Sequence, residues 1–274
     1  MGGGSVSDAQ AADGQSATAV AVHQAGLREE TRGGVTWFTL DRPERRNALT
    51  VELVAALADR ITAAAGTARA AVITGAGSAF CAGGDLADLG TVAEEGATVV
   101  TEVIYGQFHR LFRAITRAPF PIVAAINGAA LGAGLDLALA CDLRYAAQGA
   151  VLASSWIRVG LVPGMGGAYL LTRAVGATRA HEMVLLGAGV DAAQAAEWGL
   201  VNQAVEPSRL VAVVEQVCAD LGEQPRSAVA ASKAALRRAL DAGLEEELET
   251  LGATQGGLLT GEEFRSRTAR FRPR

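Results

Sequence analysis

The longest apolar stretch of the sequence, residues 121–141 (PIVAAINGAALGAGLDLALAC), constrains the fold more than any other segment. Its length matches that of a helix that crosses a membrane. However, the stretch contains Asn127 and Asp136, and a carboxylate buried in lipid would be costly. We therefore predict a buried strand over residues 121–126, a glycine-rich turn, and a buried helix over about residues 132–140.

The composition is typical of a globular protein with a sizeable core. Of the 274 residues, 50% are hydrophobic and 19% are charged, which allows one large or two small domains. The net charge of -5 argues against nucleic acid or an acidic membrane as partner. The cysteines (Cys81, Cys141 and Cys218) are widely scattered and the three histidines lack zinc-site spacing, so we expect neither a disulfide framework nor a metal. We predict a soluble, cytoplasmic protein.

The chain divides into three parts by sequence pattern. Residues 1–25 consist largely of Gly, Ser, Ala, Asp and Gln and lack the features of a secretory signal, so we predict a disordered tail. Strand and helix patterns then alternate, as in the short apolar run Val35–Leu40, whereas the pattern is almost wholly helical from residue 168 onward. This order predicts an α/β core domain over residues 26–205 and a C-terminal helical region over residues 206–274.

Two glycine-rich loops, within residues 71–89 and 121–146, each follow a predicted buried strand. One backbone amide from each loop could point at a developing oxyanion, because glycine lets a ligand approach closely. In the second loop, the donor would lie at a helix N-terminus, where unpaired amides favour negative charge. An ordinary tight turn remains the alternative for each loop taken alone.

Other glycine-loop chemistries fit less well. A dinucleotide-binding fingerprint would need a third glycine where the first loop has Phe80 and the second has Leu137. The only lysine of the chain is Lys233, in a helical context, which excludes a Walker A motif and makes a Schiff-base lysine improbable.

Taken together, five segments resemble one known family, the crotonase (enoyl-CoA hydratase/isomerase) superfamily. They occur in order and extend the resemblance over residues 30–274: LDRPERRNALT (40–50), AVITGAGSAFCAGGDL (71–86), PIVAAINGAALGAGLDLALACDLRYA (121–146), RVGLVPGMGGAYLLTRAVG (158–176) and AAEWGLVNQAV (195–205). The resemblance implies a spiral of repeated ββα units with C-terminal helices that trimerise. It also implies acyl-CoA binding and stabilisation of a thioester enolate by two backbone amides.

The resemblance assigns roles to individual positions. The two oxyanion donors would be the N–H groups of Gly84 and Ala133; alanine at 133, where glycine is more usual, leaves a backbone donor intact. Arg45 and the segment Ala82–Leu86, which includes Asp85, would frame the adenine and pantetheine of CoA. The C-terminal FRSRTARFRPR, with Phe271, would supply an aromatic wall and cations for the CoA phosphates, although a solvated basic terminus is an equal alternative.

The sequence departs from the hydratases of this family at the catalytic carboxylates. Typical hydratases hold a water between two glutamates, and the matching positions here are Asp136 and Trp156. Burial would raise the pKa of Asp136 and suit it to acid or base catalysis near neutral pH. Tryptophan exchanges no proton, so we expect Trp156 to shape the acyl pocket and to favour a flat, unsaturated or aromatic acyl group. Ser154 and Ser155 are candidates to bind substrate or water.

These features predict an acyl-CoA enzyme that isomerises or hydrates an enoyl-CoA, with Asp136 as its acid/base and CoA entering only as part of the substrate. The alternatives are an acyl-CoA decarboxylase or C–C bond hydrolase of the same superfamily, or a homologue that binds CoA esters without turnover. The acidic balance argues against RNA binding, and no plausible serine-protease triad is present. A homo-oligomer, a trimer or a dimer of trimers, is implied by the resemblance alone.

Overall fold

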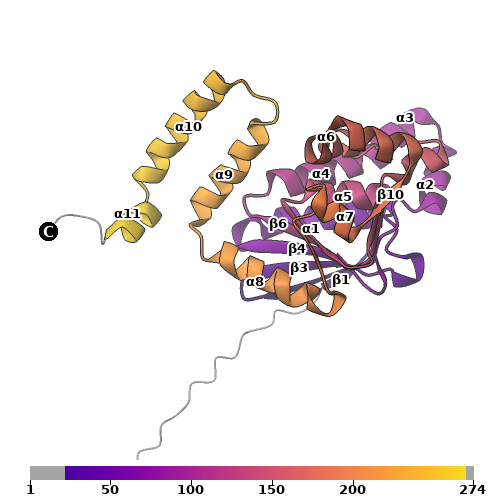
Figure 1. Cartoon of the computed structure of the whole chain (residues 1–274), viewed down its shortest axis with the longest axis horizontal. Coiled ribbons are helices and arrows are strands. Elements are labelled where there is room, and N and C mark those ends of the chain that lie inside the picture. The colour runs from indigo at the N-terminus through magenta and orange to yellow at the C-terminus, as the bar shows by residue number, and fades with distance from the viewer. Residues whose placement is uncertain (1–21, 270–274) are drawn as a thin grey trace, which may run out of the picture.

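The computed structural model describes residues 22–269, which form two β-sheets enclosed by helices and a helical arm at the C-terminal end (Figure 1). The large sheet has the strand order β1-β2-β3-β4-β6-β8-β11, and the small sheet has the order β10-β9-β7-β5. The strands of the large sheet are β1 (Val22–Gln24), β2 (Leu27–Arg32), β3 (Val35–Leu40), β4 (Ala70–Gly75), β6 (Ile122–Ile126), β8 (Leu143–Ala147) and β11 (Gln203–Val205). Those of the small sheet are β5 (Ala79–Cys81), β7 (Ala129–Leu131), β9 (Val151–Ala153) and β10 (Gly189–Asp191).

The middle of the chain repeats a strand–strand–helix unit three times. The units are β4–β5–α2, β6–β7–α5 and β8–β9–α6, with α2 at Leu86–Ala93, α5 at Ala133–Ala140 and α6 at Gly167–Leu186. In each unit, the first strand joins the large sheet and the second joins the small sheet, and neighbouring units pair in parallel. This repeat is the ββα spiral that the sequence resemblance implies, and it confirms the predicted α/β fold.

The core lies between the sheets and the helices that cover them. Helix α1 (Val51–Ala63) begins at Thr50, whose hydroxyl accepts the Leu53 N–H at 3.1 Å, and packs against α4 (Gly106–Arg117). The apolar stretch at residues 121–141 forms the fully buried β6 and α5, as expected. Helix α5 is buried on every side, which explains why its sequence is apolar all round. None of the helices within residues 22–269 is both long enough and apolar enough to cross a membrane.

Some boundaries differ from those that the sequence predicts. The structure begins a strand at Val22, so a disordered tail that reaches residue 25 is too long; β1 gains its backbone hydrogen bonds by antiparallel pairing with β2. The sequence pattern predicts one helix over about residues 97–116, which would end before Pro119. The structure instead divides this segment into α3 (Ala97–Val99), the π-helical turn η3 (Val100–Tyr105) and α4. The remaining short helical turns are η1 (Pro43–Arg45), η2 (Ala64–Gly66), η4 (Ser155–Val159) and η5 (Pro207–Arg209).

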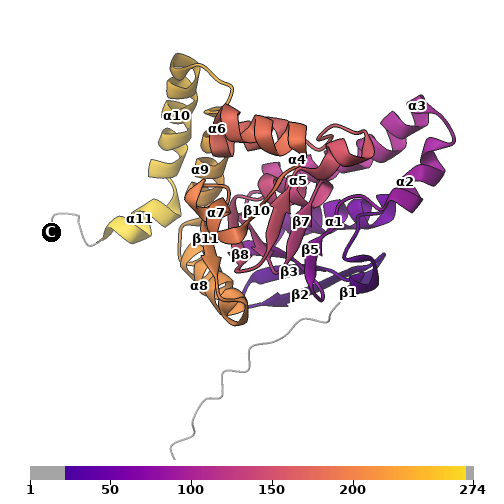
Figure 2. The same ribbon diagram turned by 45° about the vertical axis from the view of Figure 1, so that its right-hand side comes forward.

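The C-terminal region is helical, as predicted, and leaves the body of the protein (Figure 2). Helices α7 (Ala192–Glu197) and α8 (Leu210–Gly222) stay with the core, and α8 covers the outer face of the large sheet. The arm consists of α9 (Arg226–Arg238), α10 (Leu244–Leu259) and α11 (Glu262–Thr268). Lys233 anchors α9, because its buried ammonium donates to the carbonyls of Ile115 and Phe120, each at 3.0 Å, and pairs with Asp142 at 2.7 Å.

Candidate active site

Three parallel strands of the small sheet deliver the predicted site residues to one place. Strands β5, β7 and β9 are neighbours, and the chain leaving them forms residues 82–85, 132–136 and 154–156. Segments that follow the carboxyl ends of parallel neighbours emerge at the same edge of a sheet. A Cβ built on Gly83 would lie 3.7 Å from the Ala133 nitrogen, and one built on Gly132 would lie 3.3 Å from the Ser155 Oγ. The two glycine loops and the Ser155–Trp156 segment therefore meet.

The two predicted oxyanion donors are free to bind a ligand. In the bridge between Leu49 and Gly84, the Leu49 N–H donates to the Gly83 carbonyl and the Asp85 N–H to the Leu49 carbonyl, both at 2.8 Å. This pattern turns the N–H of Gly84 away from Leu49. Ala133 is the first residue of α5, where an amide has no acceptor in its own helix. Neither N–H donates to any group within residues 22–269.

Close packing around Gly134 holds the loops in register. A Cβ at Gly134 would lie 2.3 Å from the Cys81 carbonyl oxygen, so only glycine lets α5 approach β5 this closely. Gly132 has a φ of 52°, in the left-handed region that glycine adopts without strain. The Cys81 side chain is fully buried, and burial raises its pKa to about 12. Cys81 therefore stays a protonated thiol and serves as packing, not as a nucleophile.

Asp136 is a buried carboxylate in the first turn of α5, with only 1% of the residue exposed. Its backbone N–H donates to the Gly132 carbonyl at 3.1 Å, but both carboxylate oxygens lack a hydrogen-bond partner within the described residues. Burial raises the pKa of Asp136 to about 7, while the Met165 amide and the Trp156 indole N–H act in the opposite direction. Neither of these groups forms a well-aligned hydrogen bond with it. A carboxyl group in this state can take up and release a proton near neutral pH.

Two further residues shape the surroundings of that carboxylate. Trp156 lies in η4 after β9, is 7% exposed, and has an indole N–H without an acceptor within residues 22–269. Gly167 is the first residue of α6, and a Cβ there would lie 1.9 Å from the Asp136 Oδ1. Trp156 was expected from the sequence, whereas Gly167 and Met165 were not singled out. The glycine run before α6 is the signal that could have indicated them.

The residues expected to frame CoA line a single cavity of about 330 Å³. Arg45, Ala82, Asp85 and Leu86 share its wall with Gly84, the candidate oxyanion donor. Phe271 lies outside the described residues.

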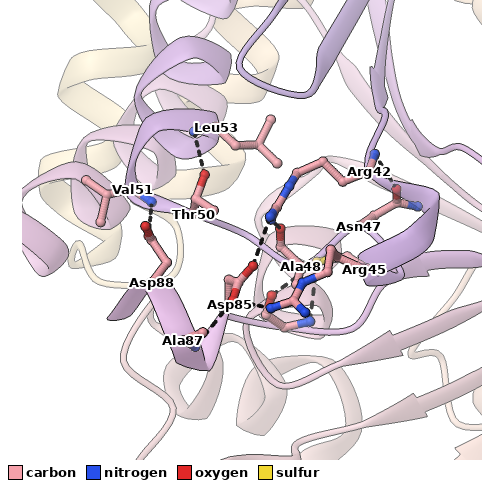
Figure 3. A network of polar contacts seen from close by, with 12 residues as sticks. Arg42, Arg45, Asn47, Ala48, Thr50, Val51, Leu53, Asp85, Ala87 and Asp88 are labelled. Atoms are coloured by element: carbon pink, nitrogen blue, oxygen red, sulfur yellow. Dashed lines mark hydrogen bonds and ion pairs between the residues drawn. The ribbon is translucent and has the colours of Figure 1, made fainter. Parts of the chain in front are cut away.

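The carboxylate of Asp85, which lines this cavity, is held by a network of arginine side chains and backbone groups (Figure 3). Asp85 is 5% exposed, and its carboxylate accepts from Arg42 at 2.9 Å and Arg45 at 3.3 Å while also capping α2 at the Ala87 N–H. Burial raises the pKa of Asp85, but the hydrogen bonds from Arg42 and Arg45 outweigh it and hold the pKa below its usual value. The carboxylate is thus occupied by protein groups, and it positions arginines beside the cavity. Arg42 was not anticipated from the sequence.

The same network joins the first turns of two helices. The Asp88 carboxylate in α2 accepts the N–H of Val51, the first residue of α1, at 3.0 Å. Together with Asp85 it fixes the segment that carries Gly84. No cluster of three or more metal-binding side chains occurs within residues 22–269.

Comparison with known proteins agrees with this architecture. Residues 30–268 match the family model described as enoyl-CoA hydratase/isomerase. A probable enoyl-CoA hydratase of Rhodobacter capsulatus is 39% identical over 245 residues, which are 89% of this chain and 94% of the relative. The 1,2-epoxyphenylacetyl-CoA isomerase of Escherichia coli is 35% identical over 218 residues, 79% of this chain and 83% of the relative. The crystal structure of a putative enoyl-CoA hydratase from Streptomyces coelicolor has a TM-score of 0.84 at 34% identity and covers 100% of this chain and 98% of its own.

The ββα spiral, the paired loops and these matches define the class: the chain belongs to the enoyl-CoA hydratase/isomerase family, the crotonase superfamily. It is an enzyme of that family, and acyl-CoA thioesters are the class of substrate that the family processes.

Proposed function

We propose that this enzyme moves a double bond within an enoyl-CoA by using Asp136 as its single acid/base. The observation that carries the proposal is that the site has one buried carboxyl group, Asp136, with a pKa of about 7. The indole of Trp156 lies where a second carboxylate would be needed to hold a water. One base suffices to take a proton from one carbon and return it to another. Isomerase and hydratase both occur among the names of the relatives.

The proposed mechanism uses the groups described above. The thioester oxygen accepts from the N–H groups of Gly84 and Ala133. Asp136 removes a proton from Cα of a 3-enoyl thioester, and the electron pair of the broken C–H bond spreads into a dienolate whose negative oxygen lies between the two amides. The same carboxyl group returns the proton to Cγ, which gives the conjugated 2-enoyl thioester. In other enzymes, an oxyanion donor of this kind contributes about 2.7 to 4 kcal/mol.

Trp156 has two tasks in this proposal. Its ring lies beside the Gly132 turn, where it borders the place of the acyl group and favours a flat, unsaturated or aromatic one. Its indole N–H faces Asp136 and stabilises the ionised form of the carboxylate.

Hydration is the second candidate. The Ser155 hydroxyl lies beside the Gly132 turn, close to the oxyanion donors, and could orient a water for attack on Cβ. Decarboxylation or C–C cleavage would depend on the oxyanion hole more than on Asp136, and a homologue without turnover would bind CoA esters only. We further propose that the arm α9–α11 mediates a homo-oligomer, because it exposes Leu236, Leu244 and Leu248.

The test is the Asp136→Ala variant, with 3-enoyl-CoA and 2-enoyl-CoA as substrates and calorimetry for CoA-ester binding. We expect turnover to fall by about 10²- to 10⁴-fold, the usual contribution of a general acid/base, with binding within a few-fold of the parent enzyme. Asp59→Ala, an exposed carboxylate on α1, is the matched control and should keep full turnover. Unchanged turnover in Asp136→Ala would remove Asp136 from the mechanism.

A further inference from the structure

A second, larger cavity, of about 790 Å³, lies between α4, α6 and the turn that joins α9 to α10. Figures 1 and 2 show these three elements around the side of the molecule on which the arm departs. One part of its wall is apolar and consists of Phe112, Met165 and the ring of Tyr169. Another part carries three arginines, namely Arg113, Arg117 and Arg237.

The three arginines bring together positive charge that is not taken up by any ion pair within residues 22–269. Arg113 and Arg117 are four residues apart on α4 and therefore share a face of that helix. Arg237 reaches the cavity from α9. Within residues 22–269, none of the three side chains forms an ion pair or a hydrogen bond. Burial lowers the pKa of Arg237, and the positive charge of Arg117 lowers it further, whereas the negative charges of Asp142 and Asp241 act in the opposite direction.

The other charged groups of the cavity are engaged or distant. Arg238 is paired with Glu247, with an Nε–Oε2 distance of 2.8 Å. The Asp241 carboxylate accepts from the Tyr169 hydroxyl and pairs with Arg173. Glu246 is exposed on α10 and lies beyond ion-pair distance of the three arginines. The cavity therefore offers an anion three guanidinium groups, each able to donate two hydrogen bonds to one carboxylate.

The position of the cavity connects it to the candidate active site. Met165 and Gly166 line it, and these residues belong to the loop that closes over Asp136: the Met165 amide faces the carboxylate and Gly167 touches it. Met165 is 1% exposed, and it both lines the cavity and places its backbone N–H toward Asp136. Methionine has three rotatable side-chain bonds, so the Met165 side chain can change its conformation to admit a chain that extends from Asp136 toward the cavity.

From this arrangement we propose that the cavity binds a carboxylate carried on an apolar body, and that its source is the far end of the substrate's acyl group. The enzyme then prefers acyl-CoA esters that end in a free carboxylate, whose chain lies against Phe112 and Met165. The assignment of the bound carboxylate to the substrate's acyl group rests on the proposed function. The same chemistry would also suit a free organic acid that binds without being transformed.

The experiment compares two series of 3-enoyl-CoA esters of equal chain length, one ending in a methyl group and one in a carboxylate. We expect kcat/KM to favour the carboxylate series by about 10- to 100-fold, the usual worth of a hydrogen bond to a charged group. Arg237→Gln and Arg117→Gln should remove that preference and leave the methyl series unchanged. Arg209→Gln, in η5, is the control and should keep the preference. Equal rates for both series in the parent enzyme would overturn the inference that the cavity binds the far end of the acyl group.

A second experiment distinguishes the failure of this inference from the failure of the proposed function. Binding of free suberate, an eight-carbon diacid, is measured by calorimetry with the parent enzyme and with Arg237→Gln. If neither ester series reacts, the proposed function fails; suberate binding that is lost in Arg237→Gln then supports the anion site with a free acid as its ligand. If the methyl and carboxylate series react equally and suberate does not bind, the cavity has no role in anion recognition.

Discussion

Gly167 leaves the space that the carboxylate of Asp136 occupies, since a Cβ at position 167 would lie 1.9 Å from the Asp136 Oδ1 and 2.5 Å from its Cγ. The first residue of α6 thus sets the position of a side chain on α5. Because both carboxylate oxygens lack hydrogen bonds within the described residues, this packing, together with Trp156 and Met165, is what orients them.

Gly167→Ala should therefore displace the Asp136 carboxylate. We expect kcat to fall by about 100-fold, because a displacement of about 1 Å has this effect on a positioned catalytic group. Gly252→Ala is the matched control: position 252 lies in α10 with nothing near its Cβ, and alanine there should stabilise the helix by up to about 1 kcal/mol without changing kcat. Full activity in Gly167→Ala would show that Asp136 is not held by this contact.

The stability of the protein should depend on pH through Asp136. Its pKa is about 7 in the folded chain and near 3.8 in an unfolded one, so between these values the folded state keeps a proton that the unfolded state has lost. The free energy of unfolding therefore falls as pH rises from about 4 to 7, by up to about 4 kcal/mol, and is constant above. Asp136→Asn should lack this decline, which denaturant titrations of both proteins at pH 5 and pH 8 will show. Parallel pH profiles of stability would contradict the raised pKa.

The rate should depend on the same ionisation in the opposite sense. As a base, Asp136 acts when it is deprotonated, so kcat/KM should rise with pH around an apparent pKa of about 7. Trp156→Phe keeps an apolar ring but removes the N–H that lowers this pKa, so the rising limb should move to higher pH. If the rising limb of the pH profile stays at the same pH and only the level of activity changes, Trp156 has a packing role alone.

The ion pairs of Asp85 should matter for both folding and CoA binding. Asp85→Asn removes the negative partner of Arg42 and Arg45 beside the smaller cavity. We expect a loss of about 2 kcal/mol in stability, typical of hydrogen bonds to charged groups, and a raised KM for CoA esters. Asp59→Asn breaks an exposed pair with Arg110 and should change stability by less than about 1 kcal/mol. If Asp85→Asn reduces the stability no more than Asp59→Asn does, the Asp85 network does not hold the loop of Gly84.

Lys233 should determine whether the arm stays docked. Lys233→Met leaves Asp142 without its cation and two carbonyls without a donor, so we expect a loss of about 3 kcal/mol and faster proteolysis between α8 and α9. Ser232→Ala, at the exposed neighbouring position, should behave like the parent protein. Unchanged proteolysis in Lys233→Met would show that other contacts dock α9.

Much of the fold could be predicted because the chain marks its buried elements clearly. The uninterrupted apolar run of β6 and α5 has no place except a core, and Thr50 begins α1 as its hydroxyl suggests. The three-residue strands of the small sheet could not be recognised, since a run such as Ala79–Cys81 is too short to show alternation. Strand β2, with the sequence LREETR, was missed because its mostly polar side chains hide the strand pattern.

The candidate site shows the same division. The positions of Gly84, Ala133 and Asp136 could be predicted from sequence motifs that occur in a fixed order along the chain. The occupation of the Asp85 carboxylate by Arg42 and Arg45 depends on residues about 40 positions apart that meet only in the folded chain. The contact between Gly167 and Asp136 joins two different ββα units, so the glycine run at the start of α6 indicates that the position is special but does not identify Asp136 as its neighbour.

The most direct test of the account is to incubate the enzyme with a 3-enoyl-CoA in deuterium oxide and to determine the mass of the product. Transfer by one carboxyl group predicts a conjugated 2-enoyl-CoA that has gained no water and that carries deuterium only to the extent that the proton on Asp136 exchanges with solvent during turnover, with the reaction lost in Asp136→Asn. A product heavier by one water would contradict isomerisation by Asp136 alone and would make the enzyme a hydratase despite Trp156.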